Sequence, residues 1–464
     1  MINDGRKYNF NEYRREQSRR SGRGQRSVRR LQKLFVTLSV TAGILTLVLA
    51  GVLLARLANR KAGDPLFRIG KTTAVSTSET GATDFVLTSE TEETKKKIVI
   101  RESLPSDPLA ESYWGTLEEA EDPLPHEHFP VKGLYLNAAV NLEENIELCK
   151  RSELNTLVID LKESDGIYFD TKNETALAVG SGYVRPVLDL PAICAQCHEN
   201  DIRVIARIVC FKDPMYVKYY PDRAICDSAG NPLYFNNEGG NAFASPYDTR
   251  NWEFYISLAK EAIDMGVDEI QFDYVRFPTG SSTTGATPYY GIENEVPART
   301  SAVNRFLQTA RIEIQDKLGV PLSADIFGIV VTSSYDGTAL GQDWSLVGMT
   351  GVDSVCPMLY PSHYAFGTMM SGNTFDYPDK YPYDVVYNAL AVSAVHHKRH
   401  GYATVRPYLQ AFTAEYLGKD HYTVYDYDAI NDEIRALQDS GLEEFILWNA
   451  TCVYPDGNYG GNNG

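Results

Sequence analysis

The chain has 464 residues, of which 43% are hydrophobic, and a formal net charge of −17. It is long enough for one large globular domain with additional segments. The charge is divided unevenly: residues 1–33 carry eleven Lys or Arg and three Asp or Glu, which leaves about −25 on the rest of the chain. An acidic main body excludes nucleic acid as the expected partner, because phosphate binding needs a basic face.

Residues 34–55 form an uncharged stretch of 22 residues. As a helix this stretch would be about 33 Å long, enough for the roughly 30 Å hydrocarbon core of a bilayer. The basic arm before it, residues 1–33, predicts a cytoplasmic N-terminus and a single-pass plasma-membrane protein with its body outside. A cleaved signal peptide is the alternative, but its apolar core would be about 7–15 residues long, and Arg56 stands where a small residue would be needed.

Residues 56–125 are rich in Ser, Thr, Glu, Lys and Pro and show no persistent helical or strand period. They predict a flexible stalk between the membrane and the body. The glycine- and asparagine-rich residues 457–464 predict a disordered tail. The folded domain is therefore expected within residues 126–456.

From Val131 onward, short apolar runs alternate with amphipathic helical stretches, which is typical of β/α units around a parallel sheet. Helices are predicted over 251–265, 301–318 and 385–397, with a short or absent helix between the fifth and sixth strands. Eight candidate strands begin at Gly133, Thr156, Arg203, Glu269, Leu322, Ser354, Thr404 and Glu444. Eight units predict a (β/α)8 TIM barrel. A doubly wound open sheet is the alternative, but no glycine-rich phosphate loop follows the first strand.

Acidic residues follow several of the predicted strands. Barrel enzymes carry their catalytic groups at the carboxyl ends of the strands, where Asp160, Asp273 and Asp325 are expected. Glycosidic cleavage uses two carboxyls, about 5–5.5 Å apart for retention of configuration and about 6.5–9.5 Å apart for inversion. Asp273 and Asp325 end neighbouring strands, which lie about 4.8 Å apart, so they can form such a pair.

The surroundings of these acids indicate different roles. Arg276 would lower the pKa of Asp273, which suits a nucleophile or stabilising carboxylate. Asp325 stands between Ala324 and Ile326, where burial would raise its pKa and suit a general acid. Asp160 is the second candidate for either role. Each Asp could instead cap the following helix, as Asp often does.

Further polar and aromatic side chains are expected at the same end of the barrel. Aromatic faces stack on pyranose rings, and polar groups bind sugar hydroxyls. The candidate substrate-binding residues are Lys162, Arg207, Tyr274, Arg276, Tyr360, His363, Gln410, Trp448 and Asn449. His363 could equally be a structural histidine.

The sequence Cys194 to His198 matches the C-x-x-C-H pattern of haem attachment. Cys194 and Cys197 also recur with Ile193 at helical spacing, which favours a buried helix face instead. The seven cysteines are scattered and do not indicate a disulfide framework or a zinc site. No cofactor and no metal is predicted.

Several strand-end sequences carry a resemblance to a known family. FDYVRFP, VIARIVCFKDP, LSADIFG, PMLYPSHY and the closing ILWNA resemble a family of bacterial glycoside hydrolase domains, over residues 131–454. The resemblance implies a (β/α)8 barrel, distantly similar to α-amylase-like and α-galactosidase-like barrels and usually secreted or membrane-anchored. It also implies a nucleophilic Asp at the end of the fourth strand, which matches Asp273. An acid/base on the fifth strand would match Asp325, although α-amylase-like barrels have Glu there.

The resulting hypothesis is a membrane-anchored glycoside hydrolase that acts outside a bacterial plasma membrane on a cell-surface or extracellular polysaccharide. Two alternatives stay open at this point. One is a barrel that binds glycan without cleaving it. The other is a metal-assisted hydrolase with Asp160, Asp273 and Asp325 as oxygen ligands.

Overall fold

The computed structural model describes residues 104, 106–180, 182–290 and 297–460. The predicted basic arm (1–33), the predicted membrane span (34–55) and most of the predicted stalk lie outside the described residues. Among the helices that are described, none is long and apolar enough to cross a membrane.

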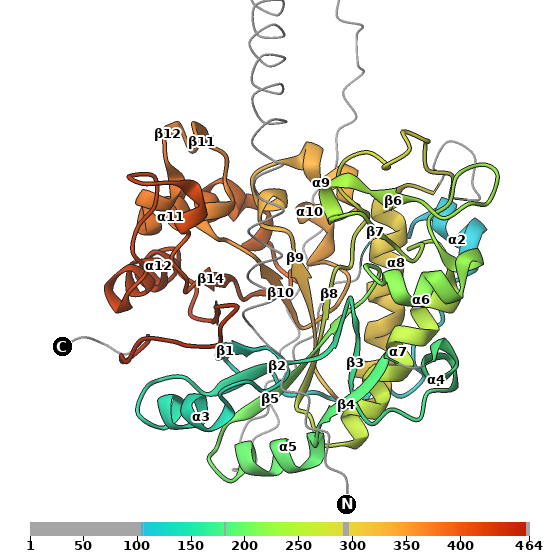
Figure 1. Ribbon diagram of the computed structural model, residues 1–464, viewed down its shortest axis with the longest axis horizontal. Helices are drawn as coiled ribbons and strands as arrows, with labels where there is room; N and C mark the ends of the chain where they lie inside the picture. Colours follow the sequence, from blue (N-terminus) through green and yellow to red (C-terminus); the bar gives the residue numbers. More distant parts are fainter. Residues whose placement is uncertain (1–103, 105, 181, 291–296, 461–464) are drawn as a thin grey trace, which may run out of the picture. The chain divides into compact units, whose positions relative to one another are not determined.

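A parallel, strongly curled sheet forms the centre of the domain (Figure 1). All eight predicted strands are present, each within one residue of its expected start. They are β1 Lys132–Leu136, β2 Thr156–Glu163, β5 Arg203–Val209, β8 Glu269–Asp273, β9 Leu322–Ile326, β10 Ser354–Pro357, the pair β13 Thr404–Val405 and β14 Tyr408–Gln410, and β15 Phe445–Trp448. The agreement follows from burial, because strands of a parallel sheet are covered on both faces and read as short apolar runs.

The strands follow the order β13-β10-β9-β8-β5-β2-β1-β15-β14, and these neighbours pair in parallel. The two ends of this order, β13 and β14, are separated in the chain only by Arg406 and Pro407. Proline has no N–H to donate and so interrupts a ladder. A parallel bridge also joins Met358, just after β10, to Tyr408 of β14. The two ends of the sheet order are therefore halves of one predicted strand.

Helices cover the outside of the curled sheet (Figure 1). They are α3 Leu142–Lys150, α5 Leu190–His198, α7 Thr249–Asp264, α8 Arg299–Arg311 with a π-helical continuation Ile312–Asp316, α9 Ser334–Leu340, α10 Trp344–Val347, α11 Pro382–His397 and α12 Tyr427–Asp439. The helices predicted over 251–265, 301–318 and 385–397 correspond to α7, α8 and α11. Only the short α9 and α10 follow β9, as predicted.

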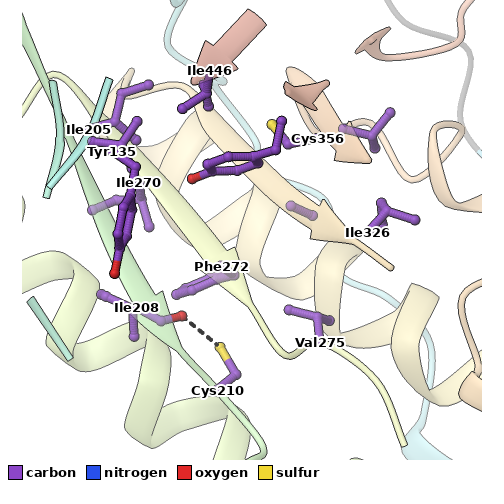
Figure 2. Packing of buried hydrophobic residues seen from close by; sticks show 14 of the residues in the cluster. Tyr135, Ile205, Ile208, Cys210, Ile270, Phe272, Val275, Ile326, Cys356 and Ile446 are labelled. Carbon is purple, nitrogen blue, oxygen red and sulfur yellow. Dashed lines mark hydrogen bonds between the residues drawn. The ribbon is translucent and has the colours of Figure 1, made fainter. Parts of the chain in front are cut away.

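Side chains alternate along each strand between the helices and the inside of the curled sheet. On β8, Phe272 faces α8 and packs against Phe306, with ring centroids 5.4 Å apart, and Figure 2 shows Phe272 within the buried hydrophobic cluster. Gln271 faces the other way, where it accepts a hydrogen bond from the Tyr408 hydroxyl at 2.5 Å. Asp273 has the same orientation as Gln271, so its carboxyl lies inside the sheet's carboxyl-terminal edge.

The prediction of a flexible stalk is wrong for residues 106–125. Helix α2 (Pro108–Trp114) begins after Asp107, whose carboxylate accepts hydrogen bonds from the backbone amides of residues 109 and 110. Trp114 then donates its indole N–H to the Tyr247 carbonyl at 3.1 Å. Two aromatic side chains supply a contact large enough to hold a segment that contains few other apolar residues.

The prediction of a disordered tail is wrong for residues 457–460. Tyr459 is buried and packs against Tyr427, with ring centroids 5.3 Å apart. Its hydroxyl donates to the Pro455 carbonyl at 2.5 Å. One aromatic ring against α12 therefore fixes a glycine-rich segment.

Several short elements were not predicted. They are β3 Gly166–Phe169, β4 Val184–Leu188, β6 Tyr234–Phe235, β7 Asn241–Ala242, β11 Thr368–Met370, β12 Asn373–Phe375, α4 Glu174–Val179 and α6 Pro214–Tyr219. β3 pairs antiparallel with β2, and β4 continues the sheet beside β3. Elements of two to six residues are too short to show a hydrophobic period.

The cysteine-rich segment before β5 forms α5, as its spacing indicated. Cys194 and Cys197 lie on the buried face, and burial raises the pKa of each thiol to about 12. His198 contacts the Asp268 carboxylate at 2.8 Å. The C-x-x-C-H pattern is thus accounted for by packing and one hydrogen bond.

Candidate active site

A cavity of about 470 Å³ opens at the carboxyl-terminal edge of the sheet, beside the ends of β5, β8 and β9. Asp273, Asp325 and Arg207 line it together with aromatic side chains. The size is typical of small-ligand sites in proteins. The strand ends predicted to carry the chemistry therefore meet at one hollow.

Arg207 is the centre of a cluster of carboxylates. It lies on β5 and is buried. Its Nη1 contacts Asp160 and also lies 2.8 Å from Glu163, and its Nη2 lies 2.5 Å from Asp273. Its Nε lies 3.5 Å from Asp325 Oδ2. One cation thus faces four acidic side chains, so at least some of these acids are expected to carry a proton.

Asp325 is the acid most strongly affected by its surroundings. Burial raises the pKa of Asp325 well above its usual range, the nearby Asp273 raises it further, and Arg207 offsets only part of this. Within the described part of the chain, neither carboxyl oxygen of Asp325 has a hydrogen-bond partner. A buried polar group without a partner is costly, and Asp325 is one of the residues that line the cavity.

Asp273 is held in place by its neighbours. Besides the contact with Arg207, its Oδ1 accepts a hydrogen bond from the backbone N–H of Tyr274. Tyr274 adopts a left-handed backbone conformation, with φ of 52°, which few residues other than glycine adopt. This strained turn follows Asp273 immediately and directs an amide toward its carboxylate.

The two candidate catalytic acids are close enough for glycosidic cleavage. Phe272 pairs in register with Ala324, so Asp273 and Asp325 follow at equivalent positions on neighbouring strands. Both contact one guanidinium, whose Nε and Nη2 are about 2.3 Å apart, and the two contacting oxygens can therefore be no more than about 8 Å apart. This limit includes the separations of retaining enzymes and much of the range of inverting ones.

Asp160 is not among the described residues that line the cavity. It is fully buried between Arg207 and Tyr135, whose hydroxyl donates to its Oδ2. Burial raises the pKa of Asp160 to about 7, against the opposing effect of Arg207. Asp160 is therefore placed to hold Arg207.

Aromatic side chains form one wall of the cavity. Tyr360 and Trp448 line it, with ring centroids 5.7 Å apart, and His363 lies 5.0 Å from Tyr360. Phe412 supports Trp448 from behind, at 5.2 Å. The structure thus brings the predicted Tyr360, His363 and Trp448 together. Tyr360 is buried, whereas Trp448 and His363 keep exposed surface on which a sugar can stack.

The predicted partner of Asp273 is wrong. Arg276 lines the cavity but pairs with Glu238, at 2.9 Å. Burial would raise the pKa of Glu238, but Arg276 and Thr279 hold it down to about 2. Arg207, which the sequence placed only among the substrate-binding residues, holds Asp273 instead. Sequence proximity misled the assignment, because the backbone turn at 274 points Arg276 away from the acid that precedes it.

Three predicted substrate-binding residues do not line the cavity. Lys162 is fully buried, 2.8 Å from Asp213 and 2.7 Å from the Val209 carbonyl. Gln410 uses its side chain to bind neighbouring segments. Asn449 donates to the backbone carbonyls of Ala411, which follows β14, and of Val453. All three have structural hydrogen bonds that join the strand ends to the loops.

The family of the chain follows from a comparison with known sequences. A family model described as "Putative glycosyl hydrolase domain" matches residues 131–454. The chain belongs to this family. No curated protein is significantly similar to it.

Solved structures similar to this glycosyl hydrolase family member include three from bacteria. A hypothetical protein from Ruminiclostridium thermocellum is 31% identical over 41% of this chain and 96% of its own, with a TM-score of 0.36. The spore cortex-lytic enzyme SleL of Bacillus cereus is 12% identical over 70% of this chain and 72% of its own, with a TM-score of 0.40. The PgaB (BpsB) glycoside hydrolase domain of Bordetella bronchiseptica is 12% identical over 70% of this chain and 95% of its own. Its TM-score of 0.51 indicates a shared fold.

Sequence reasoning on this glycosyl hydrolase family member missed several residues at the site, among them Asp336, which lines the cavity, Tyr135 and Gln342. Tyr135 lies at the end of β1, and its hydroxyl binds Asp160. Tyr135 belongs to the predicted first strand, two residues after Gly133, so the strand pattern could have indicated its position at the site. Gln342 lines the cavity and donates to the Asp325 carbonyl at 3.1 Å. It lies in the loop between α9 and α10, where no strand pattern could have identified it.

Proposed function

We propose that the chain is a glycosidase that hydrolyses a polysaccharide with two carboxyls. Asp325 is the general acid, and Asp273 is the nucleophile or the stabilising carboxylate. The proposal rests chiefly on one observation: two acids on adjacent strand ends share Arg207, yet only Asp273 is tightly bound to it. Pairs of carboxyls in such different surroundings are typical of glycosidases, in which one acid is protonated while the other is charged.

Cleavage begins with proton transfer. Asp325, whose protonated form is favoured because burial raises its pKa, donates its proton to the glycosidic oxygen as the C–O bond breaks. The positive charge that develops on the anomeric carbon is stabilised by Asp273. If Asp273 bonds to that carbon, water activated by Asp325 later releases the sugar; if it does not, Asp273 takes a proton from the attacking water.

Arg207 and Asp160 act as positioning residues in this scheme. Arg207 fixes the carboxylate of Asp273 with a charge-assisted hydrogen bond. Asp160, which binds the same guanidinium, keeps Arg207 in place. Trp448 supplies a stacking face for the sugar rings, and the buried Tyr360 packs against Trp448.

The fold and location belong to the same proposal. Because β13 and β14 are parts of one predicted strand and pair with β10 and β15 respectively, we propose that the curled sheet is a closed (β/α)8 barrel. The uncharged residues 34–55 and the basic arm before them support a single-pass anchor in a bacterial plasma membrane, with the barrel outside.

A metal-assisted mechanism is less favoured than the two-carboxyl mechanism. The guanidinium of Arg207 lies between the carboxylates of Asp160 and Asp273, in the space where a cation shared by these acids would have to lie. A glycan-binding barrel without activity is the alternative that requires an experiment.

The experiment uses the full-length chain in detergent with a panel of neutral, amino-sugar and acidic polysaccharides, and it measures new reducing ends. We expect one class to be cleaved at least about 100-fold faster than by the matched Asp325→Asn chain. Binding of a polysaccharide without any cleavage would instead indicate a glycan-binding protein. Loss of activity with a chelator would indicate the metal mechanism.

A further inference from the structure

A second cavity, of about 880 Å³, lies apart from the candidate active site. It is formed by α2 and by the loops that follow β5 and β8. None of the described residues that line it also lines the 470 Å³ cavity. Yet the loop after β8 connects the two, because its first residues, Tyr274 and Arg276, line the active-site cavity and Tyr289 lines the second one.

Aromatic side chains line much of the second cavity. Tyr113 and Tyr289 line it and are 44% and 46% exposed. Behind them, Trp114 stacks on Tyr247 with ring centroids 5.9 Å apart and planes 13° apart. The indole of Trp114 is fixed by its hydrogen bond to the Tyr247 carbonyl. Tyr113 packs against this pair, with ring centroids 4.8 Å from Trp114 and 6.3 Å from Tyr247, which reduces the entropy lost when a ligand stacks on it.

The charged side chains of the second cavity all carry the same sign. Asp222, Asp227 and Asp248 line it, and no Lys, Arg or His is among its described lining residues. Arg250 contacts Asp222 and Asp248 from outside the lining. Asp227 accepts hydrogen bonds from the backbone amides of its own turn and is partly exposed. The cavity therefore offers acceptors for hydroxyl or ammonium groups and repels anions.

We infer that the second cavity is a binding site for a saccharide chain, neutral or bearing amino groups, separate from the site of cleavage. The inference rests on the proposed function. Exposed rings bind the apolar faces of sugar rings while the carboxylates accept hydrogen bonds from hydroxyls. A saccharide is favoured over a cationic peptide because one segment that forms this cavity, the loop after β8, also carries Tyr274 and Arg276 of the candidate active site, so one polymer can contact both.

Cys226 makes the site testable without an activity measurement. It lines the second cavity and is only partly buried, whereas the other six cysteines, all within the described residues, are buried. A thiol reagent should therefore modify Cys226 first in the folded protein. A ligand in the cavity should slow that reaction.

The experiment uses the full-length Asp273→Asn chain, so that the saccharide stays intact, and the wild-type chain on ice as a second arm. Cellohexaose, hexaglucosamine, hexagalacturonate and hexalysine are the probes. We expect cellohexaose or hexaglucosamine to slow modification of Cys226 at least fivefold, and hexagalacturonate to have no effect. Tyr113→Ala and Tyr289→Ala should each raise the concentration for half-protection about 5- to 10-fold. Tyr387→Ala, a matched control that is 38% exposed on α11, should leave it unchanged.

Three results would overturn the inference: no protection by either neutral or amino-sugar hexamer, protection by hexalysine as strong as by the saccharides, or no effect of Tyr113→Ala and Tyr289→Ala. The two proposals fail separately. Polysaccharide cleavage by the wild-type chain without protection of Cys226 would contradict the second binding site but not the glycosidase proposal. Protection of Cys226 without cleavage of any polysaccharide would contradict the glycosidase proposal but not the second binding site.

Discussion

Replacement of Arg207 by Gln tests whether one guanidinium holds the carboxylate cluster together. Its nitrogens contact Asp160, Glu163 and Asp273 at hydrogen-bonding distance and Asp325 at 3.5 Å. Removal of one partner from a buried charge cluster typically costs about 3–5 kcal/mol, because the remaining charges are left without compensation. We expect Arg207→Gln to lower the free energy of unfolding at pH 7 by about that amount.

The loss should depend on pH in a defined direction. The pKa of Asp160 is raised to about 7 even with Arg207 present, so a proton is taken up as the pH falls toward 5. Protonation removes the repulsion that the missing cation leaves behind, and the difference between wild type and Arg207→Gln should therefore be smaller at pH 5 than at pH 8. Urea unfolding followed by tryptophan fluorescence at the three pH values measures this difference.

Arg276→Gln is the matched control. It removes a buried arginine that pairs with Glu238 outside the Arg207 cluster, so its effect on stability should not diminish at pH 5. The reasoning would be refuted if Arg207→Gln cost less than about 1 kcal/mol, or if its cost were the same at pH 5 and pH 8.

Further predictions concern three other groups. Asp325→Asn should slow cleavage of a polysaccharide about 10²- to 10⁴-fold. Cleavage of a dinitrophenyl glycoside should slow less than about 10-fold, because a good leaving group needs no proton. Equal losses in the two assays would contradict the role of Asp325 as a general acid. Burial lowers the pKa of His128, but the carboxylates of Asp353 and Glu444, which lie 2.8 and 2.6 Å from its ring nitrogens, raise this pKa to about 9. His128 should therefore contribute roughly 2–3 kcal/mol below pH 6.5 that is lost as the pH rises through 9, and in urea unfolding His128→Gln should lack this dependence. Lys162→Met leaves the buried carboxylate of Asp213 without its cation. It should lower the free energy of unfolding by about 3–5 kcal/mol and leave KM unchanged. A raised KM in a stable variant would instead indicate that Lys162 binds the substrate.

The strands could be predicted from the sequence because burial on both faces leaves a local signal. β8 and β9 begin at the predicted residues, and their acids reach the cavity. The raised pKa of Asp325 was also indicated by its apolar neighbours. Both inferences depend on residues adjacent in sequence, for which patterns are informative.

The partners of the acids could not be predicted in the same way. Arg276 is three residues from Asp273 but pairs with Glu238, whereas Arg207 comes from another strand. Lys162 follows Asp160 by two residues, but the ladder between β2 and β5 shifts register between them, and Lys162 contacts Asp213 instead of the cavity. A bulge of this kind changes the direction of a side chain and leaves no mark in the residue pattern.

The sequence pattern also could not predict that two segments of low apolar content are ordered. Trp114 and Tyr459 each fix a segment that composition assigned to a stalk or a tail. A single aromatic side chain contributes little to an average over many residues, yet it buries a large area in the folded chain.

The most direct test of two-carboxyl cleavage is the turnover of a polysaccharide by full-length Asp273→Asn. The account predicts that kcat falls at least about 10³-fold while calorimetry finds the polysaccharide bound with nearly wild-type affinity. Turnover above about one-tenth of the wild-type rate would contradict it.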